Sequence, residues 1–205
     1  MTPTVPTSNK PQVTGVVLAG GMGRRMGGED KGLMTLGGHP MVEYALRALG
    51  PQVDGMLISA NRNPERYARY GYPVLNDTVG DYLGPLAGMA AAMEAAPEGL
   101  LVTVPCDSPL IAGDYVARMW ESLAPSNADL AVAHDGERLQ PVFALLPTLL
   151  HESLLRFLAT GERKIDRWYA MHTHLEVDFS DRKEMFLNVN RPEERDAMEE
   201  KLSTP

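Results

Sequence analysis

The chain has 205 residues, 44% hydrophobic and 22% charged, which is typical of one globular domain of ordinary size. Its net charge of −8 argues against a general nucleic-acid surface, since such binding needs many Lys and Arg contacts to phosphates. The single cysteine, Cys106, excludes an internal disulfide framework and a Cys-rich metal site. No apolar run approaches the ~20 residues needed to span a bilayer. We expect neither nucleic acid nor a membrane as a partner.

The N-terminal residues are rich in Thr and Pro and show no basic region followed by an apolar core. This pattern predicts a disordered tail over residues 1–12 rather than a signal peptide, with the protein in the cytoplasm. No repeat or linker divides the rest, so residues 13–205 are expected to form a single domain.

Strand-like and helix-like segments alternate along the chain, which is typical of a three-layer α/β/α, Rossmann-like domain with a mostly parallel sheet. Strands are expected at 13–19, 53–60, 73–75, 100–104, 130–133, 140–146 and 174–178. Helices are expected at 41–49, 65–70, 86–96, 112–123, 149–159, 165–171 and 192–202. The turn residues Asp135 and Gly136 predict an antiparallel excursion, so the sheet is mixed.

The stretch 16–31 joins the first strand to a loop rich in glycines and cations. Its members are Gly20, Gly21, Gly23, Gly27 and Gly28, with Arg24, Arg25 and Lys31. Glycines bring backbone N–H groups close to a ligand, and cations match phosphate. The stretch therefore predicts a loop that holds the phosphates of a nucleotide, against the alternative of a glycine-rich turn with solvated arginines.

Two standard phosphate-binding fingerprints do not fit this loop. The dinucleotide fingerprint needs glycine where Met26 stands. The P-loop needs Ser or Thr after its lysine, but Lys31 precedes Gly32.

Ligands of parallel α/β sheets bind outside the carboxyl ends of the strands, which directs attention to Asp107. This carboxylate follows the central strand and lies between Pro105 and Pro109. It suits Mg²⁺, which takes one or two carboxylates together with substrate phosphates. The alternative is a turn residue that binds its own backbone. Cys106 is interpreted as a small packing residue and not a nucleophile.

Other polar residues also follow strands. Asn61 and Asp77 are expected on the same rim as the glycine loop and Asp107, where they would bind a base or a ribose, or else be ordinary turn residues. Asn188 and Asn190 lie in a late loop and are not expected on that rim. Arg163 and its neighbour Lys164 predict either a second anion site or plain surface, and the histidines show no metal-binding spacing.

The stretch Leu18-Ala19-Gly20-Gly21-x-x-x-Arg25-Met26-Gly27-x-x-Asp30-Lys31 resembles the signature of nucleotidyltransferases of the nucleotide-diphospho-sugar transferase superfamily. Within it, the chain is most similar to the molybdenum cofactor guanylyltransferases. The resemblance covers residues 13 to about 200. Four later pieces agree with it in order and spacing: Asn76-Asp77, Gly84-Pro85-Leu86-Ala87-Gly88, Pro105-Cys106-Asp107-Ser108-Pro109, and Asn188-Val189-Asn190-Arg191-Pro192-Glu193-Glu194.

The resemblance implies a nucleotide-diphospho-sugar transferase fold and transfer of GMP from GTP to molybdenum-molybdopterin, with Mg²⁺ as cofactor. It implies that Leu18, Ala19 and Gly20 contact GTP through their backbone, and that Lys31, Asn61, Asp77 and Asp107 complete the nucleotide site. It also implies that Asp107 holds Mg²⁺ and that Arg25 and Lys31 contact the phosphates. Asn188 and Asn190 are implied to lie near the pterin. The Gly20-Gly21 pair favours guanine, since related cytidylyltransferases tend to have Ala-Gly there. One departure is Gly23, where many relatives have Ser.

Other functions remain open at this point. They are a cytidylyltransferase acting on the same cofactor, a sugar-1-phosphate nucleotidyltransferase, and a non-catalytic nucleotide-binding relative. The presence of both Lys31 and Asp107 argues against the last. Other molybdenum-cofactor biosynthesis proteins and acceptor molybdoenzymes are the expected protein partners.

Overall fold

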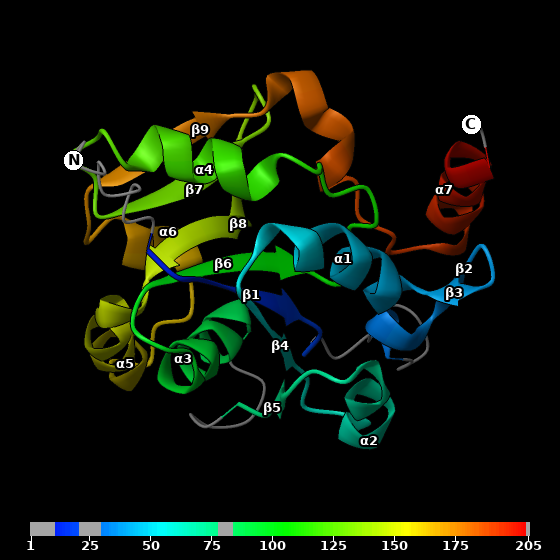
Figure 1. The fold of residues 1–205 in the computed structure, drawn as a ribbon, viewed down its shortest axis with the longest axis horizontal. Coiled ribbons are helices and arrows are strands. Elements are labelled where there is room, and N and C mark those ends of the chain that lie inside the picture. Colours follow the sequence, from blue (N-terminus) through cyan, green and yellow to red (C-terminus); the bar gives the residue numbers. More distant parts are fainter. Residues whose placement is uncertain (1–10, 21–29, 78–83, 204–205) are drawn as a thin grey trace, which may run out of the picture.

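The computed structural model describes residues 11–20, 30–77 and 84–203, which form a layered α/β structure (Figure 1). The main sheet has the strand order β5-β4-β1-β6-β8-β7-β9. Its strands are β1 (Val13–Leu18), β4 (Gly55–Ser59), β5 (Val74–Leu75), β6 (Leu100–Pro105), β7 (Leu130–His134), β8 (Leu139–Pro147) and β9 (His174–Asp178). The helices are α1 (Met41–Leu49), α2 (Pro64–Tyr67), α3 (Pro85–Ala95), α4 (Tyr115–Leu123), α5 (His151–Ala159), α6 (Ile165–Tyr169) and α7 (Pro192–Ser203).

The sheet is mixed and mostly parallel, which confirms the predicted fold class. Strands β5, β4, β1 and β6 run parallel to one another, so their carboxyl ends meet at one edge. Strand β8 is antiparallel to both β6 and β7, and β9 is parallel to β7. The predicted antiparallel excursion is therefore confirmed.

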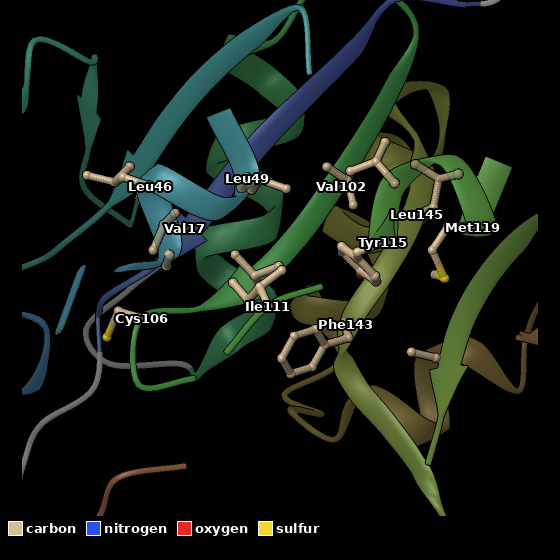
Figure 2. Packing of buried hydrophobic residues seen from close by; sticks show 14 of the residues in the cluster. Val17, Leu46, Leu49, Val102, Cys106, Ile111, Tyr115, Met119, Phe143 and Leu145 are labelled. Atoms are coloured by element: carbon tan, nitrogen blue, oxygen red, sulfur yellow. The ribbon is translucent and has the colours of Figure 1, made fainter. Parts of the chain in front are cut away.

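Two hydrophobic clusters cover the two faces of the sheet. Helices α1 and α4 pack on one face, and α3, α5 and α6 pack on the other (Figure 1). Figure 2 shows part of the first cluster, in which the ring centroids of Tyr115 and Phe143 lie 5.8 Å apart. Cys106 belongs to the same cluster and is buried, as expected of a packing residue.

Helix α3 is buried nearly all round because it lies between the sheet and α5. Its residues from Leu86 to Met93 are all buried. Gly88 permits the close approach, since a Cβ there would lie 2.5 Å from Ser59 Oγ and 2.9 Å from Leu18 Cδ2. The start of α3 is thereby held against the carboxyl ends of β1 and β4.

The short hairpin of β2 (Thr35–Leu36) and β3 (His39–Pro40) was not predicted, because each strand has just two residues. Several predicted boundaries also moved, and for two of them a turn next to the element gives the reason. Helix α4 begins at Tyr115 rather than at residue 112, because residues 112–114 form a turn. Strand β4 begins at Gly55 rather than at residue 53, after a 3₁₀ turn at Gly50–Gln52.

Helix α7 lies beside the β2–β3 hairpin at the far end of the chain (Figure 1). Leu36 and Met41 pack there with Val189 and Met198 in a separate buried cluster. The N–H of Gly37 also donates to Glu199 Oε1 at 2.9 Å. The hairpin and the late loop before α7 are therefore joined.

The predicted N-terminal tail lies mostly outside the described residues, and both it and the single-domain assignment stay predictions. Among the described residues, no helix combines the length and the apolar character that a membrane span requires.

Candidate active site

The glycine stretch leaves β1 at the shared edge of the parallel strands. The N–H of Ala19 donates to Ser59 O at 2.7 Å, which continues the pairing of β1 with β4 beyond Leu18. A Cβ on Gly20 would lie 3.3 Å from Asn61 Nδ2, so the loop starts beside Asn61. The predicted site residues Gly21 and Arg25, and Gly23 with its departure from the family, lie outside the described residues.

Asn61 and Asp77 form a reciprocal pair at the ends of β4 and β5. Asn61 Nδ2 donates to Asp77 Oδ2 at 2.6 Å, and the N–H of Asp77 donates to Asn61 Oδ1 at 2.8 Å. Burial raises the pKa of Asp77, and the hydrogen bond from Asn61 acts against that rise. The two residues act as one unit, whose carboxylate faces the cavity described below.

Asp30 is the first described residue after the glycine stretch, and its buried carboxylate anchors the residues that follow it. Asp30 accepts hydrogen bonds from Tyr67 Oη at 2.5 Å and from Asn63 Nδ2 at 2.9 Å. Gly32 packs so closely on Tyr67 that a Cβ would collide with the hydroxyl. Asp30 therefore has a structural role in the signature, which sequence reasoning did not assign, and it positions the neighbouring Lys31.

The ammonium of Lys31 joins Asp107 and Asn190. Lys31 Nζ lies 3.3 Å from Asp107 Oδ2 and donates a short hydrogen bond to Asn190 Oδ1. The side chains of Lys31 and Asp107 are 21% and 15% exposed, so water screens this ion pair weakly. Among the described residues, Asp107 uses its side chain for Lys31 and not for its own backbone, unlike a simple turn residue.

The expectation that Asn188 and Asn190 lie away from the rim was wrong. Ser108 Oγ donates to Asn188 Oδ1 at 2.6 Å, and the N–H of Val189 donates to Asp107 O at 3.0 Å. These bonds hold the late loop along the end of β6. The contact is long-range in sequence, so no local pattern indicated it.

These groups line one cavity of about 510 Å³. The lining residues from β1, β4, α3 and the segments next to them are Leu18, Gly20, Ser59, Asp77, Gly84, Pro85 and Gly88. Its centre and far side include Lys31, Pro105, Cys106, Asp107, Gln140, Pro141, Val142, Phe143, Asn188 and Asn190. Residues 140–143 come from β8 and were not predicted for the site. Burial raises the pKa of the Cys106 thiol well above its usual range, so the thiol is protonated at neutral pH.

Two other sequence hypotheses fall elsewhere in the molecule. Arg163 Nη1 donates to Leu158 O at 2.7 Å and to Glu162 O at 2.6 Å, so its guanidinium binds carbonyls at the end of α5. His172 Nε2 lies 3.0 Å from Ser153 Oγ. In the part of the chain that the structure describes, no group of three or more His, Cys, Asp or Glu side chains is arranged to hold a metal by itself.

The cavity lies at the carboxyl ends of the parallel strands, where α/β folds bind their ligands, and comparison with known proteins identifies the class. The family model described as MobA-like NTP transferase domain matches residues 15–177. The molybdenum cofactor guanylyltransferase of Shewanella loihica is 50% identical over 193 residues, covering 94% of this chain and 98% of that protein. The protein of the same name from Shewanella sediminis is 51% identical over 192 residues, again 94% of this chain and 98% of that protein.

The chain belongs to the family of molybdenum cofactor guanylyltransferases, within the MobA-like NTP transferases. Solved structures agree on the fold. The molybdopterin-guanine dinucleotide biosynthesis protein A of Archaeoglobus fulgidus is 22% identical with a TM-score of 0.79, covering 94% of this chain and all (100%) of that one. A nucleotidyl transferase from Methanothermobacter thermautotroptrophicus is 17% identical with a TM-score of 0.74, over 95% of this chain and 99% of that one.

Replacing Asn61 tests the Asn61–Asp77 unit. In Asn61→Ala, the pKa of Asp77 should rise further, because the hydrogen bond that favours the carboxylate is lost. A folded-state pKa above the unfolded value penalises ionisation, so the free energy of unfolding should fall by about 1 kcal/mol more at neutral than at acid pH. Carboxyl NMR titration measures the first effect and denaturant unfolding the second. The remote Asp178 is the control, and an unchanged Asp77 titration would contradict the pairing.

Proposed function

We propose that this protein transfers GMP from GTP to the terminal phosphate of molybdenum-molybdopterin, which forms the guanine dinucleotide of the cofactor and releases pyrophosphate. The observation that carries the proposal is the convergence of Lys31, Asp107 and Asn190 on one cavity. This convergence occurs in a chain whose sequence is 50% and 51% identical to two molybdenum cofactor guanylyltransferases. The proposed place of action is the cytoplasm, where GTP is available.

The nucleotide occupies the side of the cavity formed by the ends of β1, β4 and β5. Backbone groups at Leu18, Ala19 and Gly20 contact GTP, and Gly21 is proposed as a further part of the nucleotide site. The Asn61–Asp77 unit binds the base or the ribose. Its carboxylate has one oxygen committed to Asn61, so the other can accept hydrogen bonds from N–H or O–H groups of the nucleoside.

The reaction needs no protein nucleophile and little help from a general base. A phosphate monoester has its second pKa near ~6, so the attacking terminal phosphate is already largely dianionic at neutral pH. The attacking oxygen bonds to the α-phosphorus of GTP, and the bond from that phosphorus to the bridging oxygen of pyrophosphate breaks. The obstacle is bringing anions together, which requires positioning and positive charge.

Lys31 supplies positive charge at the centre of the cavity. Asp107 and Asn190 direct its ammonium, and the Asp30–Tyr67 anchor holds its backbone. Lys31 is proposed to lie between the two substrates and to contact the phosphates during transfer. Arg25 in the glycine loop is proposed as the second phosphate contact.

Asp107 is the proposed ligand for Mg²⁺. The donor set fits this metal, since Mg²⁺ is commonly held by one or two carboxylates together with substrate phosphates, and Asp107 offers a rigidly placed hard oxygen. When bound, Mg²⁺ supplies charge neutralisation and a template for the phosphates. The chain's own part is to hold the carboxylate at the end of β6 through the Val189–Asp107 and Ser108–Asn188 hydrogen bonds.

The acceptor occupies the side formed by β8 and the late loop, with Asn188 and Asn190 near the pterin. The homologues named above favour guanylyl transfer over the cytidylyl, sugar-phosphate and non-catalytic alternatives. Hand-off to other cofactor biosynthesis proteins and to acceptor molybdoenzymes is part of this proposal.

The decisive experiment measures pyrophosphate release with Mg²⁺ for GTP, CTP, ATP and UTP, each with molybdopterin or a hexose 1-phosphate as acceptor. We expect release with GTP and molybdopterin well above every other pair. A preference for CTP would assign the cytidylyl reaction, and a response to the sugar phosphate alone would overturn the acceptor. Nucleotide binding without any release would indicate a non-catalytic relative.

Removing the charge of Lys31 should abolish most of the turnover. Lys31→Ala is expected to lower kcat by roughly 100-fold or more, because charge stabilisation at the reacting phosphates is lost. Circular dichroism should show an intact fold. Lys183→Ala is the matched control, since that lysine pairs with Glu137 on the exposed surface away from the cavity. Near-normal turnover in Lys31→Ala would contradict the proposed role.

Changing Asp107 should alter the metal requirement. Asp107→Asn keeps the shape of the side chain but removes the charged oxygen that Mg²⁺ prefers, so half-maximal activity should need at least about tenfold more Mg²⁺. Titrating Mg²⁺ into metal-free protein with GTP and molybdopterin measures this shift. Asp178→Asn, on the edge strand β9, serves as the control. An unchanged Mg²⁺ dependence would exclude Asp107 as the ligand.

A further inference from the structure

The far wall of the cavity is an irregular part of β8. Strand β8 pairs with β7 at Val132↔Ala144, but the next pair is Ala133↔Gln140, so residues 141–143 are extra on β8. The pairing of β8 with β6 also ends at Thr103↔Ala144. Residues 141–143 therefore bulge out of the ladder, and with Gln140 they line the cavity. Bulges redirect side chains and are frequent beside active sites.

Buried side chains fix the shape of this bulge. Thr103 Oγ1 donates to Val142 O at 2.5 Å, and Tyr169 Oη donates to Pro141 O at 2.8 Å. Both donors come from buried residues. Carbonyls that have left the strand ladder thus keep hydrogen-bond partners, which is required of buried backbone groups. Phe143 anchors the bulge further, with its ring centroid 5.0 Å from that of Phe186.

The side chain of Gln140 is oriented by Asp135, which is not among the residues that line the cavity. Gln140 Nε2 donates to Asp135 Oδ2 at 2.6 Å. The other oxygen, Asp135 Oδ1, accepts the N–H groups of Glu137 and Arg138, both at 2.8 Å. Although burial opposes it, these hydrogen bonds lower the pKa of Asp135, so the carboxylate is ionised at neutral pH.

An ionised carboxylate accepts hydrogen bonds and cannot donate them, so the NH₂ group of Gln140 must turn toward Asp135. The carbonyl oxygen Oε1 is then the acceptor that Gln140 has left for a ligand. Among the described residues, no donor is bonded to it. Because Gln140 lines the cavity, we expect Asp135 to make it present this acceptor to a ligand there.

We propose that Gln140 is a specificity-determining residue for the acceptor substrate, in which Oε1 accepts a hydrogen bond from an N–H group of the pterin ring. Pro141 and Val142 supply apolar surface for the face of the ring. Asp135 is a positioning residue, because it acts through Gln140. This inference rests on the proposed function, and it assigns pterin recognition to a bulge rather than to the charged centre of the cavity.

The distribution of charge supports this placement. The cavity is lined by the neutral amides of Gln140, Asn188 and Asn190 as well as by the charged Lys31 and Asp107, which Asn190 joins through its bond to Lys31. Neutral amides suit an uncharged heterocycle with N–H and carbonyl groups, and charged groups suit phosphates. A site that hydrogen-bonds a ligand group discriminates strongly against analogues that lack it.

The first test replaces Gln140 with leucine, which has a similar size and no acceptor atom. KM for molybdopterin at saturating GTP should rise about tenfold, since a hydrogen bond lost in a desolvated site costs about 1.4 kcal/mol. KM for GTP and the midpoint of urea unfolding should stay unchanged. Glu137→Gln, in the same hairpin turn but exposed, is the control with both KM values unchanged.

The second test exchanges the carboxylate group of position 135 with the amide group of position 140. In Asp135→Asn, Oδ1 can still accept the turn N–H groups, but an NH₂ group replaces Oδ2, so Gln140 flips and presents a donor to the cavity. KM for molybdopterin should rise as in Gln140→Leu. Adding Gln140→Glu to Asp135→Asn restores an acceptor atom facing the cavity, and KM should recover at least threefold. A merely structural role predicts no such recovery.

The outcomes separate this inference from the proposed function. If wild-type protein releases no pyrophosphate from GTP and molybdopterin, the proposed function fails and this inference fails with it. If wild type is active but Gln140→Leu leaves KM for molybdopterin unchanged, the inference alone is overturned. An equal rise in both KM values, with a lower unfolding midpoint, also overturns it, since Gln140 would then support the fold.

Discussion

The ammonium of Lys31 lies between the carboxylate of Asp107 and the amide oxygen of Asn190, so three segments far apart in sequence meet at one charge. Each segment is fixed by its own contacts. Asp30 and Tyr67 hold the first, β6 carries the second, and the third lies along Asp107 through backbone and side-chain hydrogen bonds. Moving any one of them would leave a weakly solvated ion without its partner, which is costly. The junction therefore fixes the positions of these three segments relative to one another.

This junction supplies positive charge in a protein that is acidic as a whole. The chain carries a net charge of −8, and its proposed substrates are anions, so positive charge has to be local and held in place. A lysine free in solvent would be screened and mobile, whereas Lys31 is largely buried and tied to two partners. Asp107 both orients this lysine and supplies the carboxylate proposed for Mg²⁺. One short region thus meets both electrostatic needs of phosphoryl transfer.

Much of the fold followed from the sequence because its signals are local. Alternating apolar segments with turn residues between them predicted the seven main strands, and the strand-end rule placed Asn61, Asp77 and Asp107 on one rim. Lys31 was found through its place in the glycine stretch. The β2–β3 hairpin was missed, because its two-residue strands carry too few positions for a pattern to show.

The parts of the site that the residue pattern alone missed depend on contacts that are long-range in sequence, and Asn188 and Asn190 were named only through the family resemblance. Asn190 meets Lys31 across 159 positions, and Asn188 meets Ser108 across 80. No local pattern encodes such pairings. The role of Gln140 depends on the register shift between β7 and β8, and strand periodicity alone predicts a continuous ladder there. Asp30 was quoted within a motif, but its structural role appeared with its partner Tyr67.

The two sides of the cavity differ in how regular their backbone is, and the proposed ligands match this difference. The side proposed for the nucleotide is built from parallel strands that end at one edge, where the backbone groups proposed for GTP lie. The acceptor side begins where β8 separates from β6 after Thr103. Beyond that point the bulge lines the cavity and, through Thr103 and Tyr169, keeps its own carbonyls bonded. The proposed recognition of the acceptor thus falls on the strand that has the register shift, whereas the proposed nucleotide site falls on strands with continuous parallel pairing.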